Sequence, residues 1–229
     1  MSLQENITRI KVVYDALGNL AGQVVFVGGA TVALYSTRPA GEVRPTEDVD
    51  IVIELAHYKG YAGVEEQLRA KGFVNDQESG VICRYRIQGV VVDVMPTEPS
   101  VIGFANRWYP QGFQTAMENQ IDAGYTIRLF RPDYFIASKL EAFAGRGGGD
   151  GRTSTDFEDI VFVLNNRPGI WTEMKVAPPE LKTYLQQIFS KLVAQETIYE
   201  WVSAHLDYAE QRRVTLIVGG MQAFAEENT

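Results

Sequence analysis

The chain has 229 residues, of which 45% are hydrophobic and 22% are charged, a composition typical of a globular protein with one large or two small domains. Its formal net charge of −8 argues against a protein that coats nucleic acid non-specifically, because such binding depends on Lys and Arg that neutralise phosphates. The single cysteine, Cys83, excludes an internal disulfide. The two separated histidines, His57 and His205, argue against a zinc site or Ser-His-Asp chemistry.

Targeting signals and membrane segments are not expected either. The first residues lack a basic start followed by an apolar run, and no stretch reaches the roughly 20 apolar residues of a membrane helix. With one cysteine in addition, the chain is expected to be a cytoplasmic protein of a reducing compartment, with no membrane partner.

The first predicted elements lead to a glycine pair. Their apolar spacing indicates a packing helix over 5–20 that ends at Gly18 or Gly22, a strand over 23–27 and a helix over 30–36. Gly28 and Gly29 leave backbone N–H groups accessible beside a helix N-terminus, where phosphate binds readily. We interpret the pair as a phosphate seat, with a plain tight turn as the alternative.

A pair of acids opens the next predicted strand. After a loop with Pro and Gly over 37–45, Asp48 and Asp50 begin a β-branched apolar run, and strand side chains two residues apart point the same way. Two carboxylates this close repel each other unless a cation lies between them, and Mg²⁺ is the usual partner. A turn or strand edge is the alternative. Arg44 and Thr46, directly before, are expected to position this strand through hydrogen bonds.

A third acid lies on a predicted hairpin. A helix over 61–71 precedes strands over 81–87 and 90–95, joined at Gln88-Gly89. Asp93 stands in the second strand, and an acid inside an apolar strand is costly to bury without a partner, which a metal would provide. Cys83 is expected in the core. Arg84 and Arg86 share one face: they could hold phosphates or RNA beside the acids, but a solvated edge is the favoured interpretation.

The rest of the chain is predicted to be mainly helical. Residues 100–117 carry aromatic side chains without a period, which could wall a base pocket or simply pack, and a short strand follows over 125–130. Further on, the pattern indicates a helix over 132–144, a glycine-rich mobile loop over 145–152, a helix over 156–164 capped by Ser154 or Thr155, and a tail of two or three helices over 178–227 that breaks at Gly219-Gly220.

The order of these motifs is similar to that of a known group of enzymes. A glycine pair, a short helix, an Asp-x-Asp strand and a third acid on a neighbouring strand resemble the DNA polymerase β-like nucleotidyltransferase superfamily. In the second half, Lys139 on a helix, then Arg146, then Asp156 and Asp159 resemble the AbiEii-type nucleotidyltransferases, which are often toxins of toxin–antitoxin pairs and phage-defence systems. The match spans residues 27–164.

The resemblance implies a fold and a domain organisation. It implies an α+β protein in which a small mixed or antiparallel sheet with flanking helices forms a nucleotidyltransferase core over 1–130. Residues 131–229 would be a helical region that completes the active-site cleft, with motif helices over 132–164 and a helical tail over 178–229.

The resemblance also implies the roles of individual residues. Lys139 would neutralise the triphosphate, Asp93 would help to activate the acceptor hydroxyl, and Arg146 and Arg152 would close over the nucleotide as a lid. Before the motif order is counted, Lys139 could equally be a solvated helix residue. Asp156 could be only a helix cap. The implied ligands of one or two Mg²⁺ ions are Asp48, Asp50 and Asp93. The implied catalytic residues are the same three acids together with Lys139 and Asp159. The implied nucleotide-binding residues are Gly28, Gly29, Thr31, Lys139, Arg146 and Arg152.

Three functions compete on this basis. The first is a Mg²⁺-dependent nucleotidyltransferase that moves a nucleotidyl group from a nucleoside triphosphate to a hydroxyl of RNA, such as a tRNA end, of a protein or of a small molecule. In one form of this hypothesis, the enzyme is the toxin of a toxin–antitoxin pair and has a cognate antitoxin. The second is a catalytically inactive nucleotide- or partner-binding module on the same fold. Metal-dependent phosphoester hydrolysis fits the acids but not Gly28-Gly29 and Lys139, so it ranks last.

Overall fold

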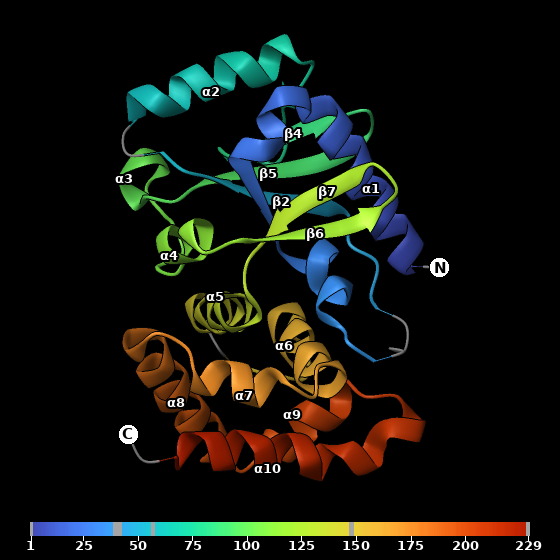
Figure 1. The fold of residues 1–229 in the computed structure, drawn as a ribbon, viewed down its shortest axis with the longest axis vertical. Coiled ribbons are helices and arrows are strands. Elements are labelled where there is room, and N and C mark those ends of the chain that lie inside the picture. The colour runs from blue at the N-terminus through green and yellow to red at the C-terminus, as the bar shows by residue number, and fades with distance from the viewer. Residues whose placement is uncertain (1, 39–42, 56–57, 147–148, 228–229) are drawn as a thin grey trace. The chain divides into compact units, whose positions relative to one another are not determined.

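The computed structural model describes residues 2–38, 43–55, 58–146 and 149–227 (Figure 1). The chain divides into two compact units, of which the first comprises Met1–Leu34 with Glu42–Arg131 and the second comprises Tyr35–Gly41 with Pro132–Thr229. His57 and residues 147 and 148 of the glycine-rich run lie outside the described residues. The two units are described separately below.

The first unit is built on a mixed sheet of seven strands in the order β3-β4-β5-β2-β1-β7-β6. Strand β2 pairs in parallel with β5, and β1 with β7, whereas the other neighbours are antiparallel. The predicted α+β fold is therefore confirmed. The strands are β1 (Val24–Val27), β2 (Asp48–Ile53), β3 (Val74–Asn75), β4 (Arg84–Ile87), β5 (Val90–Pro96), β6 (Met117–Asp122) and β7 (Tyr125–Leu129).

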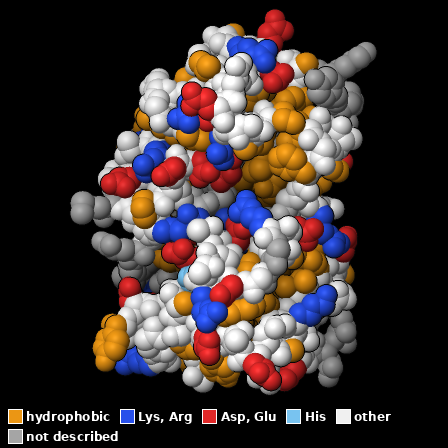
Figure 2. Space-filling view, turned by 180° about the vertical axis from the view of Figure 1, so that it is seen from behind, with side chains coloured by type: hydrophobic (Ala, Val, Ile, Leu, Met, Phe, Trp, Pro, Cys, Tyr) orange, Lys and Arg blue, Asp and Glu red, His pale blue; other side chains and the backbone are white. Residues whose placement is uncertain are grey.

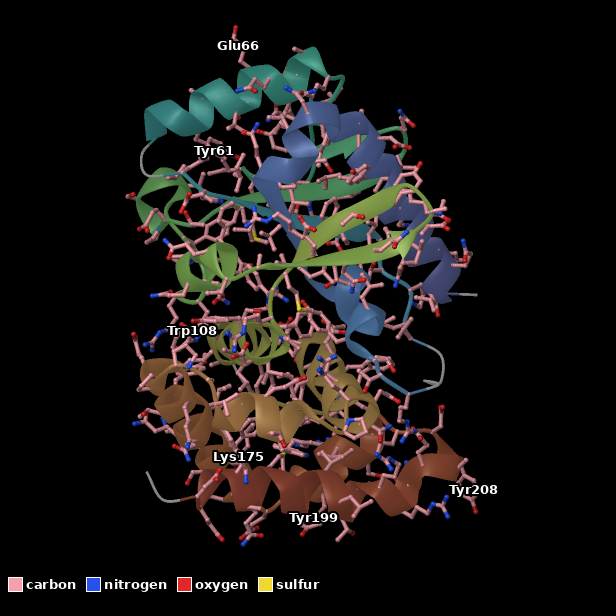
Figure 3. All side chains as sticks on the ribbon, viewed as in Figure 1. Tyr61, Glu66, Trp108, Lys175, Tyr199 and Tyr208 are labelled. Atoms are coloured by element: carbon pink, nitrogen blue, oxygen red, sulfur yellow. The ribbon has the colours of Figure 1, made fainter. Side chains whose placement is uncertain are left out.

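Two helices cover one face of this sheet, namely α1 (Ser2–Leu17) and α2 (Tyr58–Ala70). Figure 3 shows Glu66 on the outer side of α2 and Tyr61, which is buried, on its inner side. Apolar residues of both helices form one core with alternate residues of the strands, among them Val49, Ile51 and Ile53 of β2 and Val92 and Val94 of β5. Because side chains alternate along a strand, the intervening acids of β2 and β5 lie on the opposite face.

Short helical segments complete the first unit. The first helix ends at Leu17 because Gly18 follows in the left-handed conformation, with φ of 53°. The helix predicted over 30–36 is a 3₁₀-helix instead. The segments are η1 (Gly18–Gln23), η2 (Gly29–Tyr35), which runs to the start of the second unit, α3 (Pro99–Ile102) and α4 (Tyr109–Gln114).

Within its described residues, the second unit consists of helices joined by short loops and turns. Ser154 caps α6 as predicted, since its hydroxyl oxygen accepts a hydrogen bond of 3.2 Å from the backbone N–H of Phe157. No helix among the described ranges of either unit combines the length and apolar character needed to cross a membrane. The helices are α5 (Pro132–Gly145), α6 (Thr155–Asn166), α7 (Ile170–Lys175), α8 (Pro179–Val193), α9 (Ile198–Ala204), η3 (Tyr208–Arg213) and α10 (Val214–Ala225).

Some local predictions were wrong. The strand expected over 81–87 begins only at Arg84, and the edge strands β3 and β6 were not predicted. The expected break at Gly219-Gly220 is also absent, because both glycines lie within α10. A Cβ atom on Gly220 would lie 2.5 Å from the ring of Trp171, so this glycine provides room for an aromatic side chain rather than ending the helix.

Candidate functional site

Strands β2 and β5 bring three carboxylates together in the first unit. In the parallel register, Asp50 is the partner of Asp93, and Asp48 stands two residues before Asp50 on the same side of β2. All three acids therefore lie on the sheet face that α1 and α2 leave uncovered. The side chain of Asp48 is 38% exposed, whereas that of Asp93 is 12% exposed, so one edge of the cluster is accessible to solvent.

The glycine pair lies against this cluster. Gly28 has a φ of 73°, and a Cβ atom at this position would lie 1.8 Å from Oδ2 of Asp50, so only glycine allows the carboxylate to approach the turn. The carbonyl of Gly28 accepts hydrogen bonds from the backbone N–H and the hydroxyl of Thr31, at 3.3 and 2.9 Å. The turn and the Asp-x-Asp strand thus form one compact arrangement.

The phosphate seat predicted at Gly28 and Gly29 depended on the N-terminus of an α-helix. Segment η2 is instead a 3₁₀-helix of seven residues, and the carboxylate of Asp50 lies against Gly28. A Cβ atom on Gly29 would lie 2.4 Å from the guanidinium of Arg44. The two glycines therefore leave room beside the backbone for the side chains of Asp50 and Arg44. A phosphate bound here would be repelled by the carboxylate of Asp50 unless a cation lay between them.

The segment before β2 is fixed to α1 by hydrogen bonds. The side-chain oxygen of Asn6 accepts from the backbone N–H of Thr46 at 3.2 Å, and its amide donates to the carbonyl of Arg44 at 3.3 Å. The hydroxyl of Thr46 also donates to the backbone carbonyl of Asp48 at 3.2 Å. As predicted, Thr46 positions the start of the acid-bearing strand.

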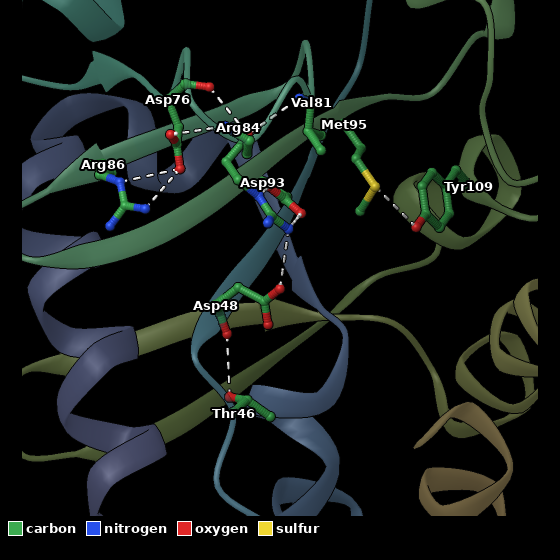
Figure 4. A network of polar contacts seen from close by, with 10 residues as sticks. Thr46, Asp48, Asp76, Val81, Arg84, Arg86, Asp93, Met95 and Tyr109 are labelled. Atoms are coloured by element: carbon green, nitrogen blue, oxygen red, sulfur yellow. Dashed lines mark hydrogen bonds and ion pairs between the residues drawn. The ribbon is translucent and has the colours of Figure 1, made fainter. Parts of the chain in front are cut away.

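A cationic side chain lies within the acid cluster (Figure 4). Arg84 is the register partner of Asp93, and its guanidinium binds that carboxylate through two hydrogen bonds, Nε to Oδ1 at 2.8 Å and Nη2 to Oδ2 at 2.7 Å. The same Nη2 lies 3.4 Å from Oδ2 of Asp48. The hydrogen bond to Asp93 raises the pKa of Arg84 above its ordinary value, so the guanidinium stays charged. The favoured interpretation of Arg84 as part of a solvated edge was wrong.

The hairpin could have revealed this pair from the sequence. A two-residue turn at Gln88-Gly89 makes Ile87 the partner of Val90, and counting outward from there sets Arg84 opposite Asp93. Arg86, two residues along the same strand face, forms a separate ion pair of 2.9 Å with the buried Asp76. The two arginines thus share a strand face but contact different acids.

The oxygen donors of the cluster fit Mg²⁺ only in part. Carboxylates are the ligands that this ion prefers, and Asp48 and Asp50 project from one strand face. Both oxygens of Asp93, however, accept from Arg84, so the cation expected beside this acid is a guanidinium. Within the described part of the chain, no group of three or more His, Cys, Asp or Glu side chains is arranged to hold a metal. Asp48 and Asp50 thus fit the ion, whereas Asp93 in this arrangement does not.

The second unit holds a separate charged cluster between α5 and α6. The ammonium of Lys139 lies 3.1 Å from Oδ1 of Asp156 and 2.7 Å from Oδ2 of Asp159, and all three side chains are buried. Arg146 forms a further ion pair of 2.8 Å with Asp156. Lys139 is therefore not a solvated helix residue. Asp156 is more than a cap, since Ser154 caps this helix.

Arg152, predicted to act in a lid, is held within the second unit. Its guanidinium binds Asp150 at 2.8 Å and lies 3.5 Å from Glu200 on α9. The hydrogen bond from Arg152 lowers the pKa of Asp150. The neighbouring Gly151 packs against Trp201 and its carbonyl lies 2.6 Å from Nε2 of His205. Gly151 and Arg152 of the glycine-rich run thus make specific contacts with α9 and with His205, the residue that follows it.

Cys83 is buried, as predicted, directly before β4. Its backbone carbonyl accepts a hydrogen bond of 2.8 Å from the N–H of Val94. Burial raises the pKa of its thiol to about 11, and the nearby carboxylate of Asp93 adds to the effect. The thiol is therefore neutral at physiological pH, which agrees with a packing role.

Comparison with known proteins bears on the fold. A solved structure described as an antigenic nucleotidyltransferase-like protein from Paracoccidioides brasiliensis superposes with a TM-score of 0.51, covering 91% of this chain and 97% of that one. The chain has a nucleotidyltransferase-like fold. At 22% sequence identity, the likeness concerns the fold alone. No protein-family model and no curated protein matches the sequence, and the AbiEii-type relation stays a hypothesis.

Proposed function

We propose that the protein is a Mg²⁺-dependent nucleotidyltransferase. The observation that carries the proposal is the meeting of Asp48, Asp50 and Asp93 on one sheet face beside the Gly28 turn. The nucleotidyltransferase-like fold supports it. In the proposed reaction, an acceptor hydroxyl gives its proton to the carboxylate of Asp93, and its oxygen forms a bond to the α-phosphorus of a nucleoside triphosphate. The bond from this phosphorus to the bridging oxygen breaks, and pyrophosphate leaves.

The roles of the acids follow from their positions. Asp48 and Asp50 would hold the ion, which when bound offsets negative charge on the triphosphate. Packing against Gly28 fixes the carboxylate of Asp50, and the exposure of Asp48 leaves one side of the pair open to a ligand. Asp93, on the neighbouring strand, would complete the set of oxygen ligands once its pair with Arg84 opens.

The acceptor class in this proposal is an RNA end, a protein or a small molecule bearing a hydroxyl. On the face that Figure 2 shows, acidic side chains are interspersed with basic ones among the described residues. Together with the net charge of −8, this favours an acceptor bound through local contacts over one bound by a broad basic surface. The AbiEii-type resemblance adds the proposal of a toxin that is held inactive by a cognate antitoxin.

Transfer of label tests this function. The purified protein is mixed with each of the four α-³²P-labelled nucleoside triphosphates, Mg²⁺ and pooled RNA or protein acceptors, and acid-stable label is measured. Mutation of residues that only hydrogen-bond to metal ligands typically lowers metal affinity or activity by about 10–100-fold. Asp48→Asn or Asp50→Asn, which would change a ligand itself, should therefore lower transfer by more than about 100-fold. Glu118→Gln, an exposed acid on β6 of the same sheet, is the matched control. Unchanged transfer in both Asp variants would refute the proposal.

A second function is favoured by one observation, the closed pair between Arg84 and Asp93. If the guanidinium of Arg84 stayed bound to Asp93 permanently, the protein would suit a module that binds a nucleotide or a partner without turnover. This alternative predicts nucleotide binding in equilibrium dialysis without transfer of label to any acceptor. Replacing Asp48 or Asp50 with Asn should then change the stability of the protein little.

A further inference from the structure

We infer that Arg84 is an internal cation that competes with the divalent metal for Asp93 and Asp48, so that metal enters the cluster as the guanidinium withdraws. This inference rests on the proposed function, because it concerns the regulation of the same site. It assigns to Arg84 a positioning role that the motif pattern does not contain.

The geometry of the guanidinium carries the inference. Arg84 starts on β4 and reaches over β5, where it binds both oxygens of Asp93, to approach Asp48 on β2. The group thus lies between the carboxylates of two neighbouring strands. A divalent cation held by Asp48 and Asp93 would need the carboxylate oxygens that Arg84 already contacts. Two cations cannot occupy this position together, because like charges at such distances repel strongly.

The pair can open without disturbing the sheet. The Arg84 side chain is 27% exposed, so solvent reaches part of the guanidinium, while the strand backbone is fixed by its ladder to β5. A long side chain on a fixed strand can exchange a carboxylate partner for water through rotation of its own torsions. Displacement of Arg84 would also leave a second cation near the site, where a triphosphate could accept its hydrogen bonds.

Metal affinity without nucleotide tests the competition. Mn²⁺ binding to the full chain is measured by isothermal titration calorimetry and by electron paramagnetic resonance for the wild type, Arg84→Gln and Arg86→Gln. We expect Arg84→Gln to bind Mn²⁺ at least about tenfold more tightly, a change of about 1.4 kcal/mol. Arg86→Gln should stay within about twofold of the wild type, because Arg86 pairs with Asp76 on the same strand face instead.

A second measurement follows the guanidinium in the wild-type protein and uses only the conservative variant Arg84→Lys for assignment. Wild-type protein labelled with ¹⁵N-arginine is titrated with Mg²⁺, and the side-chain Nε–H signals are followed by NMR. The Arg84 signal, assigned by its loss in a folded Arg84→Lys variant, should shift as the ion binds, while the Arg86 signal stays fixed. Lys cannot form the two parallel hydrogen bonds, so Arg84→Lys should have a metal affinity between those of the wild type and Arg84→Gln.

Each outcome decides a different question. Equal Mn²⁺ affinity in wild type and Arg84→Gln, or an Arg84 signal that stays fixed while metal binds, overturns the competition and leaves the proposed nucleotidyl transfer standing. Binding of Mn²⁺ to none of the variants overturns both. Tighter binding in Arg84→Gln supports the competition even where no acceptor for nucleotidyl transfer has been found.

Discussion

Buried charged side chains in two clusters of this protein lie beside opposite charges. Lys139 lies between Asp156 and Asp159 in the second unit, and Asp93 is paired with Arg84 in the first. An ion taken out of water loses several kcal/mol of hydration, which only a close counter-charge with good hydrogen-bond geometry offsets. Removing one member of such a group therefore leaves the others uncompensated.

The Lys139 cluster provides a test at the scale of single residues. Lys139→Met should destabilise the protein by about 3–5 kcal/mol, because Asp156 and Asp159 remain buried without their ammonium partner. Urea unfolding followed by circular dichroism at pH 7 measures the change.

Arg146→Met is the matched control for Lys139→Met. Arg146 also pairs with Asp156, but its side chain is 73% exposed, so its loss should cost less than about 1 kcal/mol. Similar losses of stability in both variants would show that the burial of Lys139 does not determine its contribution.

At the scale of elements, packing decides where a helix can continue. The glycines of α10 occupy neighbouring positions in the same helix, but their surroundings differ. A Cβ atom on Gly220 would meet the ring of Trp171 at 2.5 Å, whereas a Cβ atom on Gly219 has no atom within 4 Å among those described. The helix persists through both glycines because its apolar residues, such as Val218 and Met221, are buried.

Alanine at these two positions should therefore have opposite effects. Gly219→Ala should stabilise the protein by roughly 0.5–1 kcal/mol, since alanine loses less conformational entropy than glycine in a helix. Gly220→Ala should destabilise it by about 1–3 kcal/mol, because the new methyl group displaces Trp171. Thermal unfolding of the two variants, compared with the wild type, measures both changes. A stabilising effect at both positions would contradict the packing argument.

At the scale of the whole molecule, the buried thiol of Cys83 links stability to pH. Burial raises the pKa of this thiol from 9.0 to about 11, so the folded state favours the neutral form more strongly than the unfolded state does. A group whose pKa is raised on folding contributes fully below its unfolded pKa and loses that contribution as the pH approaches its folded value. The contribution is therefore present below pH 9 and declines towards pH 11.

Alkaline unfolding measures this linkage. Between pH 8 and pH 11, the wild type should lose on the order of 2 kcal/mol more free energy of unfolding than Cys83→Ala, which has no thiol to ionise. Urea midpoints of both proteins across this range provide the comparison. Burial also raises the pKa of Tyr85, but that decline is common to both proteins. Parallel pH profiles would show that the thiol is not the group responsible.

Local patterns were sufficient for much of the fold. The cap at Ser154, the hairpin turn at Gln88-Gly89 and the alternation of Asp48 and Asp50 with buried residues all depend on near neighbours in the chain. Strand β6 was not predicted because its alternating residues are polar or only half buried, so it has no apolar face for a pattern to detect. The helix break predicted at Gly219-Gly220 was wrong because Trp171, the side chain for which Gly220 makes room, is distant in the sequence.

The sequence alone therefore determined the elements that carry the chemistry and the residue types at the candidate site. The register of the hairpin already sets Arg84 opposite Asp93. Only the tertiary structure decided that Arg84 also approaches Asp48 on β2 and that Lys139 pairs with Asp159 on another helix. The physical reason is range: backbone propensity and capping act over a few residues, whereas the pairing of charges depends on distances that folding sets.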